Sequence, residues 1–327
     1  MPGDTRRRRL AGLRNDVAGN RGPAGHGRRA ALWAAAFAAG LGGAGLGGAG
    51  LGGAASGQPL ASPPASQQAL APMADRVAAA LDLDRLALVI AAEMTGLADP
   101  LSSAADGTGD AQWAQAVRRI ATPDRLARGL RAGLDQAIAD MGARPPAPLA
   151  EAVAFWTGDL GRRALSLQLS ARVALVDPGV EAAASAAFAE AMARADPRAA
   201  QVTRLIAAAD LVDPAVALSL NMGMAMLRGL RDAGGLAVPL SDDDIAAEVA
   251  AQEAQLRAQL AGWAEALLYL SCAGLTDAEV EVLIAIAASP GGRELSALAD
   301  RAALVALTDV ARSLGRASAR GARQDQP

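Results

Sequence analysis

The sequence predicts an all-α protein, a compact bundle of many helices built as two related halves. Three observations indicate this fold. Apolar residues recur at steps of three and four, no stretch alternates polar and apolar residues as a strand would, and capping residues stand before prolines where helices would begin. Hydrophobic residues make up 52% of the 327 residues but aromatic residues only 2%, so alanine-rich helices can approach one another closely.

The N-terminal segment, residues 1–56, has the three parts of a secretory signal. A region rich in arginine comes first, an uncharged apolar run follows from Ala30 to Ala55, and small residues end that run. We expect cleavage near Ala55 and export to the periplasm. The many glycines of the run lower its helix propensity and argue against a durable transmembrane helix. Retention of the segment as an inner-membrane anchor is the alternative.

The rest of the chain divides into three parts. Residues 57–72 are rich in Pro, Ser, Ala and Gln and predict a flexible linker, residues 73–316 predict the helical domain, and residues 317–327 predict a disordered tail. Eight of the 31 basic residues but only two of the 34 acidic residues precede the linker, so the mature chain is acidic. An acidic chain repels phosphate backbones, and we expect neither nucleic-acid binding nor an integral membrane span in it.

The helical domain is punctuated by capping residues and glycines, which predict ten or eleven helices. Helix starts are expected at the residues that precede prolines, namely Thr122, Asp177, Asp196, Asp213 and Ser289, and at the capping boxes of Ser241 and Thr276. Helix ends are expected at Gly142, Gly234, Gly235 and Gly274. The predicted ranges are 74–95, 110–120, 123–141, 147–157, 159–176, 178–194, 197–211, 214–232, 241–271, 277–288 and 290–315.

Two parts of the domain resemble each other at an offset of 131 residues. Residues 148–167 and 279–298 each have the pattern of a short helix, a break and a longer helix, and a long amphipathic helix precedes each of them. We therefore predict an internal duplication with repeats near 123–176 and 241–315. The alternative is that two unrelated helical hairpins use the same turn chemistry.

The break between the two helices is the most specific feature of both copies. Six residues are expected to form these structural corners: Ser289, Pro290, Gly292, Arg293, Gly161 and Arg162. A serine before a proline can end one helix and cap the next, a glycine lets a neighbouring helix approach closely, and an arginine can reach the carbonyl groups at a helix end.

At the second corner the sequence resembles a known family. The stretch from Leu275 to Glu279, followed by Ser289-Pro290 and Gly292, is similar to the signature of domain-of-unknown-function family 2059. The resemblance covers roughly residues 73–316. It implies a periplasmic, all-helical protein with no established activity, and it brings no catalytic residues to this chain.

Cysteine and histidine are too scarce for several kinds of site. Cys272 has no second cysteine for an intrachain disulfide, and a structural zinc site needs about four Cys or His ligands. The one histidine, His26, lies in the expected signal, which leaves no histidine base for nucleophilic catalysis. We expect no metal and no cofactor. Cys272 is interpreted as a buried apolar residue, with a disulfide-linked dimer as the alternative.

One acidic residue is a candidate general acid. Glu93 ends the apolar run that begins at Leu86, and a lone glutamate in an apolar wall can have a raised pKa. This observation supports the alternative function, an envelope hydrolase that uses a single carboxylate. The competing interpretation is a solvated carboxylate or a partner for an arginine such as Arg119.

Two further clusters favour structural interpretations. Met222, Met224 and Met226 could be soft copper ligands, but only Met222 and Met226 share a helix face, so core packing is preferred. The three consecutive aspartates 242–244 match no calcium-loop spacing, and we expect them to complement a helix dipole.

The combined observations predict a non-enzymatic periplasmic helical module that binds a protein or a cell-envelope component, as a monomer or a homodimer. The candidate interaction residues are Phe155, Trp156, Asn221 and Trp263. The apolar stripe Leu256, Leu260, Trp263, Leu267 and Leu270 is also considered, although core packing is its preferred interpretation. A membrane-anchored helical module is the remaining alternative.

Overall fold

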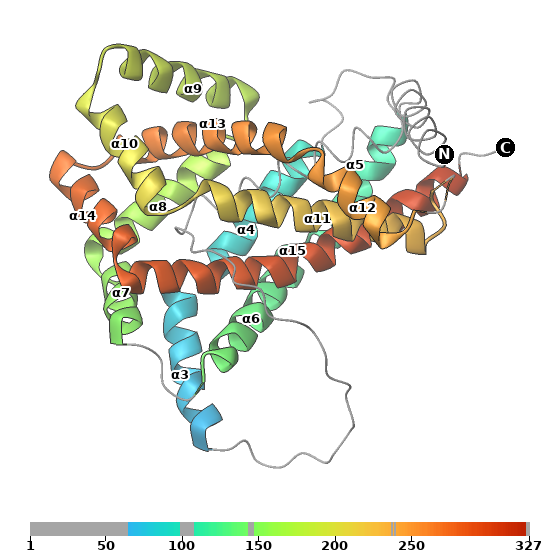
Figure 1. The fold of residues 1–327 in the computed structure, drawn as a ribbon, viewed down its shortest axis with the longest axis horizontal. Coiled ribbons are helices and arrows are strands. Elements are labelled where there is room, and N and C mark those ends of the chain that lie inside the picture. Colours follow the sequence, from blue (N-terminus) through green and yellow to red (C-terminus); the bar gives the residue numbers. More distant parts are fainter. Residues whose placement is uncertain (1–64, 99–107, 143–146, 237, 239, 325–327) are drawn as a thin grey trace, which may run out of the picture.

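The computed structural model describes residues 65–98, 108–142, 147–236, 238 and 240–324 (Figure 1). The predicted signal, residues 1–56, lies outside these residues. The described residues form helices and no strand, which confirms the all-α fold. The helices are α3 (Ala65–Ala80), α4 (Leu83–Leu97), α5 (Thr108–Ile120), α6 (Pro123–Asp140), α7 (Ala147–Thr157), α8 (Asp159–Ala174), α9 (Pro178–Ala193), α10 (Pro197–Ala208), α11 (Val212–Asp232), α12 (Asp242–Ala250), α13 (Glu253–Cys272), α14 (Asp277–Ala288) and α15 (Pro290–Gln324).

The long helix α15 is the centre of the arrangement. It packs against α5, α6, α7 and α11, and Figure 1 shows α11 and α15 running side by side in the same direction. On the other side of α11, α13 packs against α8, α9, α10 and α11, and α9 lies at the periphery of the molecule. Elements from the two ends of the chain therefore meet along α15.

The contact between α11 and α15 depends on two glycines. A Cβ atom on Gly229 would overlap the carbonyl oxygen of Arg312, and one on Gly315 would overlap that of Met226. Because neither backbone could move away without separating the helices, only glycine fits at these two positions. The close axis approach expected from the alanine-rich composition is confirmed at this crossing.

Buried apolar side chains form two large clusters and a small one. The first cluster comes mainly from α3, α4, α6, α11 and α15, and the second from α8, α9, α10, α13 and α14. The small cluster joins Ala215 and Val216 of α11 to Leu256 and Leu260 of α13. Each large cluster joins helices far apart in the sequence, and Trp156 packs against both, which agrees with a single bundle.

Most predicted helix starts are confirmed by capping hydrogen bonds. Thr122, Asp177 and Asp196 each accept a hydrogen bond from a backbone N–H of the first turn, and a proline occupies that turn in all three helices. Ser241 and Thr276 form full capping boxes. Two predicted ends are confirmed as well, because Gly142 and Gly234 follow α6 and α11 with φ of 83° and 67°.

The predicted helix 74–95 is wrong, because two helices replace it. α3 ends at Ala80 and α4 begins at Leu83, and between them Asp82 adopts the left-handed conformation with φ of 46°. Leu81 and Leu83 are both buried, although side chains two residues apart on one helix would point in different directions. The break at Asp82 allows both to enter the core, and aspartate tolerates this conformation better than most residues.

The predicted helix 241–271 is also divided. α12 ends at Ala250 and α13 begins at Glu253. No large apolar side chain stands between Val249 and Leu256, so nothing anchors the intervening turn to the core. The predicted stripe on α13 also ends early, because Leu270 is 36% exposed. Its steps of four and three average 3.5 residues, and such a stripe drifts around a straight helix of 3.6 residues per turn.

Three helix boundaries differ from the prediction at other places. α3 begins at Ala65, inside the segment predicted to be a flexible linker. α11 begins at Val212, so Pro214 lies in its first turn, where the missing N–H needs no partner, and Asp213 is not the cap. α15 continues to Gln324, past the predicted end, because Ala319 is fully buried and holds this part of the helix in the fold.

None of the helices that the described residues form is by itself both long enough and apolar enough to cross a membrane. Two pairs of consecutive helices are long and apolar enough only when each pair is taken together, and each pair is bent. α10 and α11 meet at 57°, and α14 and α15 meet at 73°.

Candidate functional site

The two structural corners have the same hydrogen-bond geometry. Between α7 and α8 the N–H of Gly158 donates to the Phe155 carbonyl at 2.9 Å, and between α14 and α15 the N–H of Ser289 donates to the Ile286 carbonyl at 3.1 Å. At each corner the chain turns at a single residue, Gly158 in the first and Ser289 in the second. These two residues lie 131 positions apart. The corner at Ser289 has two extra bonds, because its hydroxyl donates to the Ile286 carbonyl at 2.7 Å and accepts a hydrogen bond from the Gly292 N–H at 2.9 Å.

The predicted glycines and arginines occupy equivalent positions in the two corners. A Cβ atom on Gly161 or Gly292 would overlap the carbonyl oxygen six residues earlier. Arg162 and Arg293 each donate from Nη1 to the carbonyl five residues earlier. Pro290 supplies the first residue of α15. These residues close the bends between helices, whereas the duplication that they suggested stays a prediction.

The four candidate interaction residues have different surroundings. Phe155 and Trp156 contact each other edge to face, with ring centroids 5.4 Å apart, and both are half-buried. Trp156 borders the two large core clusters, and Trp263 borders the second large cluster and the small one. Asn221 donates to the Ala217 carbonyl of its own helix at 2.8 Å. Each of these side chains thus contributes to the fold.

Glu93 is not the lone carboxylate that its apolar run predicted. Its two oxygens accept hydrogen bonds from Nε and Nη2 of Arg172, both at 2.8 Å, and both side chains are almost completely buried. The expected arginine partner, Arg119, is therefore replaced by Arg172 of α8. With both oxygens engaged, this carboxylate stabilises the contact between α4 and α8.

The polar contact between α4 and α8 extends beyond this pair. Arg85 donates to the hydroxyl groups of Ser166 and Ser170 at 2.9 and 3.1 Å. Nη1 of Arg172 and Oε1 of Gln168 are buried without a hydrogen-bond partner among the described residues. The two helices are therefore joined by directional bonds, and apolar packing is only part of their contact.

Sequence reasoning missed a second acid that reaches the interior, the half-buried Asp300 of α15. Its Oδ2 is inaccessible and has no hydrogen-bond partner among the described residues. Burial raises the pKa of Asp300 well above its usual value, and the nearby carboxylate of Asp210 adds to the effect. The pKa of Asp210 is itself raised by burial and by the charge of Asp213, against the opposing charge of Arg257. The available signal was an aspartate one helical turn before the apolar position 303 and two turns before position 307.

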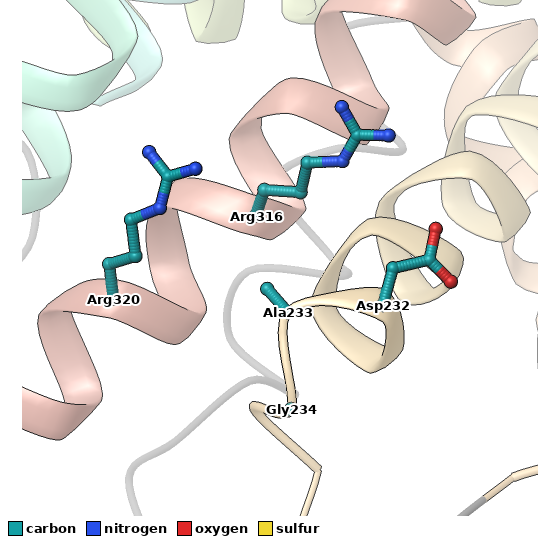
Figure 2. A pocket seen from close by; sticks show the side chains of 5 residues that line it. All are labelled: Asp232, Ala233, Gly234, Arg316 and Arg320. Carbon is teal, nitrogen blue, oxygen red and sulfur yellow. The ribbon is translucent and has the colours of Figure 1, made fainter.

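An open hollow of about 570 Å³ lies between the C-terminal turn of α11 and the last third of α15. Its lining residues are Asp232, Ala233, Gly234, Arg316 and Arg320. Figure 2 shows the two arginines leaving α15 on the same side, one turn apart, across from the end of α11. Two guanidinium groups at this spacing can share one multivalent anion.

The acid in this hollow is already neutralised by another residue. Asp232 accepts a hydrogen bond from Nη2 of Arg312 at 2.5 Å, and this bond lowers the pKa of Asp232, helped by the charges of Arg312, Arg231 and Arg316. Among the residues that the structure describes, Arg316 and Arg320 make no ion pair. The hollow therefore carries an excess of positive charge, although the chain as a whole is acidic.

The other candidate ligands have structural surroundings. Met222 and Met226 are buried in the first core cluster. Asp244 completes the capping box of α12, and Asp242 pairs with Arg228 and Arg231. Over the described part of the chain, no three His, Cys, Asp or Glu side chains are grouped closely enough to hold a metal ion.

Cys272 lies at the end of α13 and is buried. Burial raises the pKa of its thiol to about 11, although the charge of Arg198 and a hydrogen bond with Ser271 act in the opposite direction. The thiol is therefore protonated at neutral pH, and a protonated thiol is a poor nucleophile.

No protein-family model, curated protein or solved structure matches the chain. The similarity to domain-of-unknown-function family 2059 consequently stays a prediction from the residues of the second corner.

Proposed function

We propose that this protein is a non-enzymatic helical binding module of the periplasm, and that it binds an anionic component of the cell envelope at the arginine-lined hollow. The observation that carries the proposal is the pair Arg316 and Arg320, two cations one turn apart that make no ion pair within the described residues. A guanidinium group donates bidentate hydrogen bonds to carboxylate and phosphate, so the pair fits a ligand that carries several such groups.

The contrast with the rest of the surface supports this choice of site. Other arginines of the same region are paired: Arg312 with Asp232, Arg125 with Asp309, and Arg231 with Asp242. In a chain with more acidic than basic residues, two adjacent cations without an acidic partner leave a local positive field. Such a field attracts anions and weakens as salt is added.

The surroundings of Glu93 and Asp300 support a non-enzymatic role. A general acid must come within hydrogen-bond reach of the atom that it protonates. Both oxygens of Glu93 are engaged by Arg172, and Oδ2 of Asp300 is inaccessible. Neither carboxyl group borders the hollow.

The ligand class is tested by isothermal titration calorimetry, in which the full chain is titrated with two probes at low ionic strength. Inorganic triphosphate represents phosphate-bearing components, and a short polyglutamate peptide represents carboxylate-bearing ones. We expect saturable binding of at least one probe, and loss of about tenfold or more in affinity for the double variant Arg316→Ala, Arg320→Ala, because each charge-assisted bond contributes about 1.5–3 kcal/mol.

A matched control distinguishes the effect of the hollow on affinity from the effect of net charge. Arg128 and Arg301 are exposed and make no ion pair with a described residue, so the double variant Arg128→Ala, Arg301→Ala changes the net charge equally. Equal weakening by the two double variants, or unchanged binding in the hollow variant, contradicts the proposed site.

The periplasmic location rests on the expected signal, residues 1–56, and has its own test. Mass spectrometry of the protein recovered from the periplasm should find a new N-terminus near Ala55. An intact Met1 in the membrane fraction would support the anchored alternative.

A further inference from the structure

The end of α11 is fixed against α15 by close contacts between the two helices. A Cβ atom on Gly229 would overlap the carbonyl oxygen of Arg312, and one on Gly235 would lie 2.6 Å from the Cβ atom of Ala319. Asp232 stands midway between these two glycines, in the last turn of α11. Its backbone is therefore held beside the part of α15 that carries the arginines of the hollow, and its side chain lines the hollow from the α11 side (Figure 2).

The carboxylate of Asp232 is bound by two guanidinium groups. Its Oδ2 accepts the hydrogen bond from Nη2 of Arg312 at 2.5 Å, and its Oδ1 lies 3.6 Å from Nε of Arg231. The side chains of Asp232 and Arg312 are 30% and 48% exposed, so a solute can reach this pair. A carboxylate in the last turn of a helix opposes the helix dipole, which favours a cation there. The position of Asp232 is therefore unfavourable for α11 itself, and the neighbouring arginines compensate for it.

Arg312 belongs to the same row as the two arginines of the hollow. Arg312, Arg316 and Arg320 are spaced four residues apart on α15, so they follow one another along one face with a rise of about 6 Å for each step. Asp232 engages the first of them, whereas the other two make no ion pair within the described residues. The carboxylate of Asp232 thus shows how an anion is held at one end of this row.

We propose that Asp232 is an internal competitor of the anionic ligand, and that a ligand with several negative charges displaces it from Arg312 and spans all three arginines. This inference rests on the proposed function, because it concerns the same site. The exchange replaces one carboxylate–guanidinium bond by a bond between the ligand and the same guanidinium group. An exposed ion pair contributes little to the stability of a fold, so Arg312 can change partners without unfolding of the chain.

The tethered carboxylate selects ligands by their charge. A group attached to the chain acts at an effective concentration on the order of millimolar or more, whereas its competitor must arrive from solution. A monovalent anion only exchanges one negative charge for another at Arg312 and gains little there. An anion already bound to Arg316 and Arg320 is itself held beside Arg312, and it competes on equal terms. The ligand class that fits is consequently an oligoanion, with its charges distributed over a length of up to about 12 Å.

Isothermal titration calorimetry with inorganic triphosphate tests the competition in the full chain. Asp232→Asn should bind triphosphate about tenfold more tightly than the unmodified chain, because the ligand no longer competes with a carboxylate for Arg312. The double variant Asp232→Asn, Arg312→Ala should lose this gain, since the freed guanidinium group is then missing. An unchanged affinity in Asp232→Asn overturns the proposal, and so does a gain that persists at full size in the double variant.

Asp309→Asn is the matched control for net charge. Asp309 lies on the same helix and accepts hydrogen bonds from Nη2 and Nε of Arg125 at 2.7 and 3.1 Å, so its replacement also removes one negative charge and frees one arginine. Neither residue lines the hollow. Any gain in affinity for triphosphate should therefore be several times smaller than in Asp232→Asn. An equal gain would assign the effect to net charge and overturn the proposal.

A titration of Asp232 in the unmodified chain gives an independent measurement. The hydrogen bond with Arg312, helped by the charges of Arg312, Arg231 and Arg316, lowers the pKa of Asp232 below its ordinary value. Nuclear magnetic resonance of the carboxyl carbon should show the midpoint rising when triphosphate saturates the chain, because Asp232 then loses its hydrogen bond with Arg312. A midpoint that is unchanged at saturation overturns the proposal.

Failure of this inference is distinguishable from failure of the proposed function. If Arg316→Ala, Arg320→Ala weakens triphosphate binding while Asp232→Asn leaves it unchanged, the hollow binds anions and only the competition is wrong. If triphosphate binds neither the unmodified chain nor Asp232→Asn, the competition is wrong as well, and the titration with polyglutamate then decides the proposed function by itself.

Discussion

Replacement of Glu93 by glutamine should destabilise the protein strongly, because it leaves the charge of Arg172 buried and unpaired. The guanidinium group is inaccessible and makes both of its charge-assisted bonds at 2.8 Å with this carboxylate, while Nη1 has no partner among the described residues. Removal of one partner of such a pair costs about 3–5 kcal/mol. A domain of this size is stable by about 5–15 kcal/mol, so the variant should lose a large share of its stability.

The double variant Glu93→Leu, Arg172→Met should behave differently. It removes both charges and fills the space with apolar atoms, and such replacements are often neutral or stabilising. Urea unfolding followed by circular dichroism gives the free energy of unfolding of each variant. The single variants Glu93→Leu and Arg172→Met complete the mutant cycle. We expect a coupling energy of about 3 kcal/mol or more. Additive effects within about 0.5 kcal/mol would refute the argument.

The exposed pair Arg131 and Asp135 is the matched control for this cycle. It also joins an arginine to a carboxylate at 2.8 Å, but its side chains are 41% and 49% exposed. An exposed pair at this helix spacing contributes about 0.3–0.5 kcal/mol, so its cycle should give a coupling energy several times smaller. Similar values for the two cycles would show that burial of Glu93 and Arg172 is not what gives their interaction its strength.

Three other outcomes are expected from single positions. Gly315→Ala should destabilise the chain by about 1–3 kcal/mol in urea unfolding, since its Cβ atom would overlap a backbone carbonyl of α11, whereas Gly262→Ala, which meets open space in mid-helix, should stabilise it by about 0.5–1 kcal/mol. Thr276→Ala should cost about 1 kcal/mol in the same measurement through loss of the capping box of α14, and Thr276→Ser should cost little. Alkylation of Cys272 near neutral pH should be much slower in the folded chain than in the urea-unfolded chain, because burial covers the thiol and raises its pKa to about 11; equal rates would contradict this burial.

The helical architecture was predictable because it depends on local chemistry. Three helix starts are marked in the sequence by a residue with a side-chain oxygen directly before a proline. These residues are Thr122, Asp177 and Asp196, and each accepts the expected capping hydrogen bond. Caps of this kind act within four residues and need no tertiary partner. The break at Asp82 has no such signal, because this residue leaves the helical conformation to bring flanking apolar residues into the core.

The buried charges were only partly predictable. Glu93 was noticed, because it ends an apolar run, but its partner Arg172 follows Leu165 and Leu169 at helical spacing and was not considered as a core residue. An arginine and a glutamate that both occupy apolar stripe positions predict each other, since a buried charge needs a partner. Asp300 has no such partner to predict it, and the arginines of the hollow are individually indistinguishable from ordinary surface residues.

The packing of the two predicted repeats shows why they form one folding unit. A shift of 131 residues moves α6, α7 and α8 almost onto α13, α14 and the first part of α15. The first helix of each set packs against the last helix of the other, α6 on α15 and α13 on α8. Each set therefore buries a large part of its apolar surface against its counterpart. Because α15 also carries Gly315 against α11, a helix that lies between the two sets in the sequence is held by the same long helix. A displacement of α15 must consequently change the packing of both sets together.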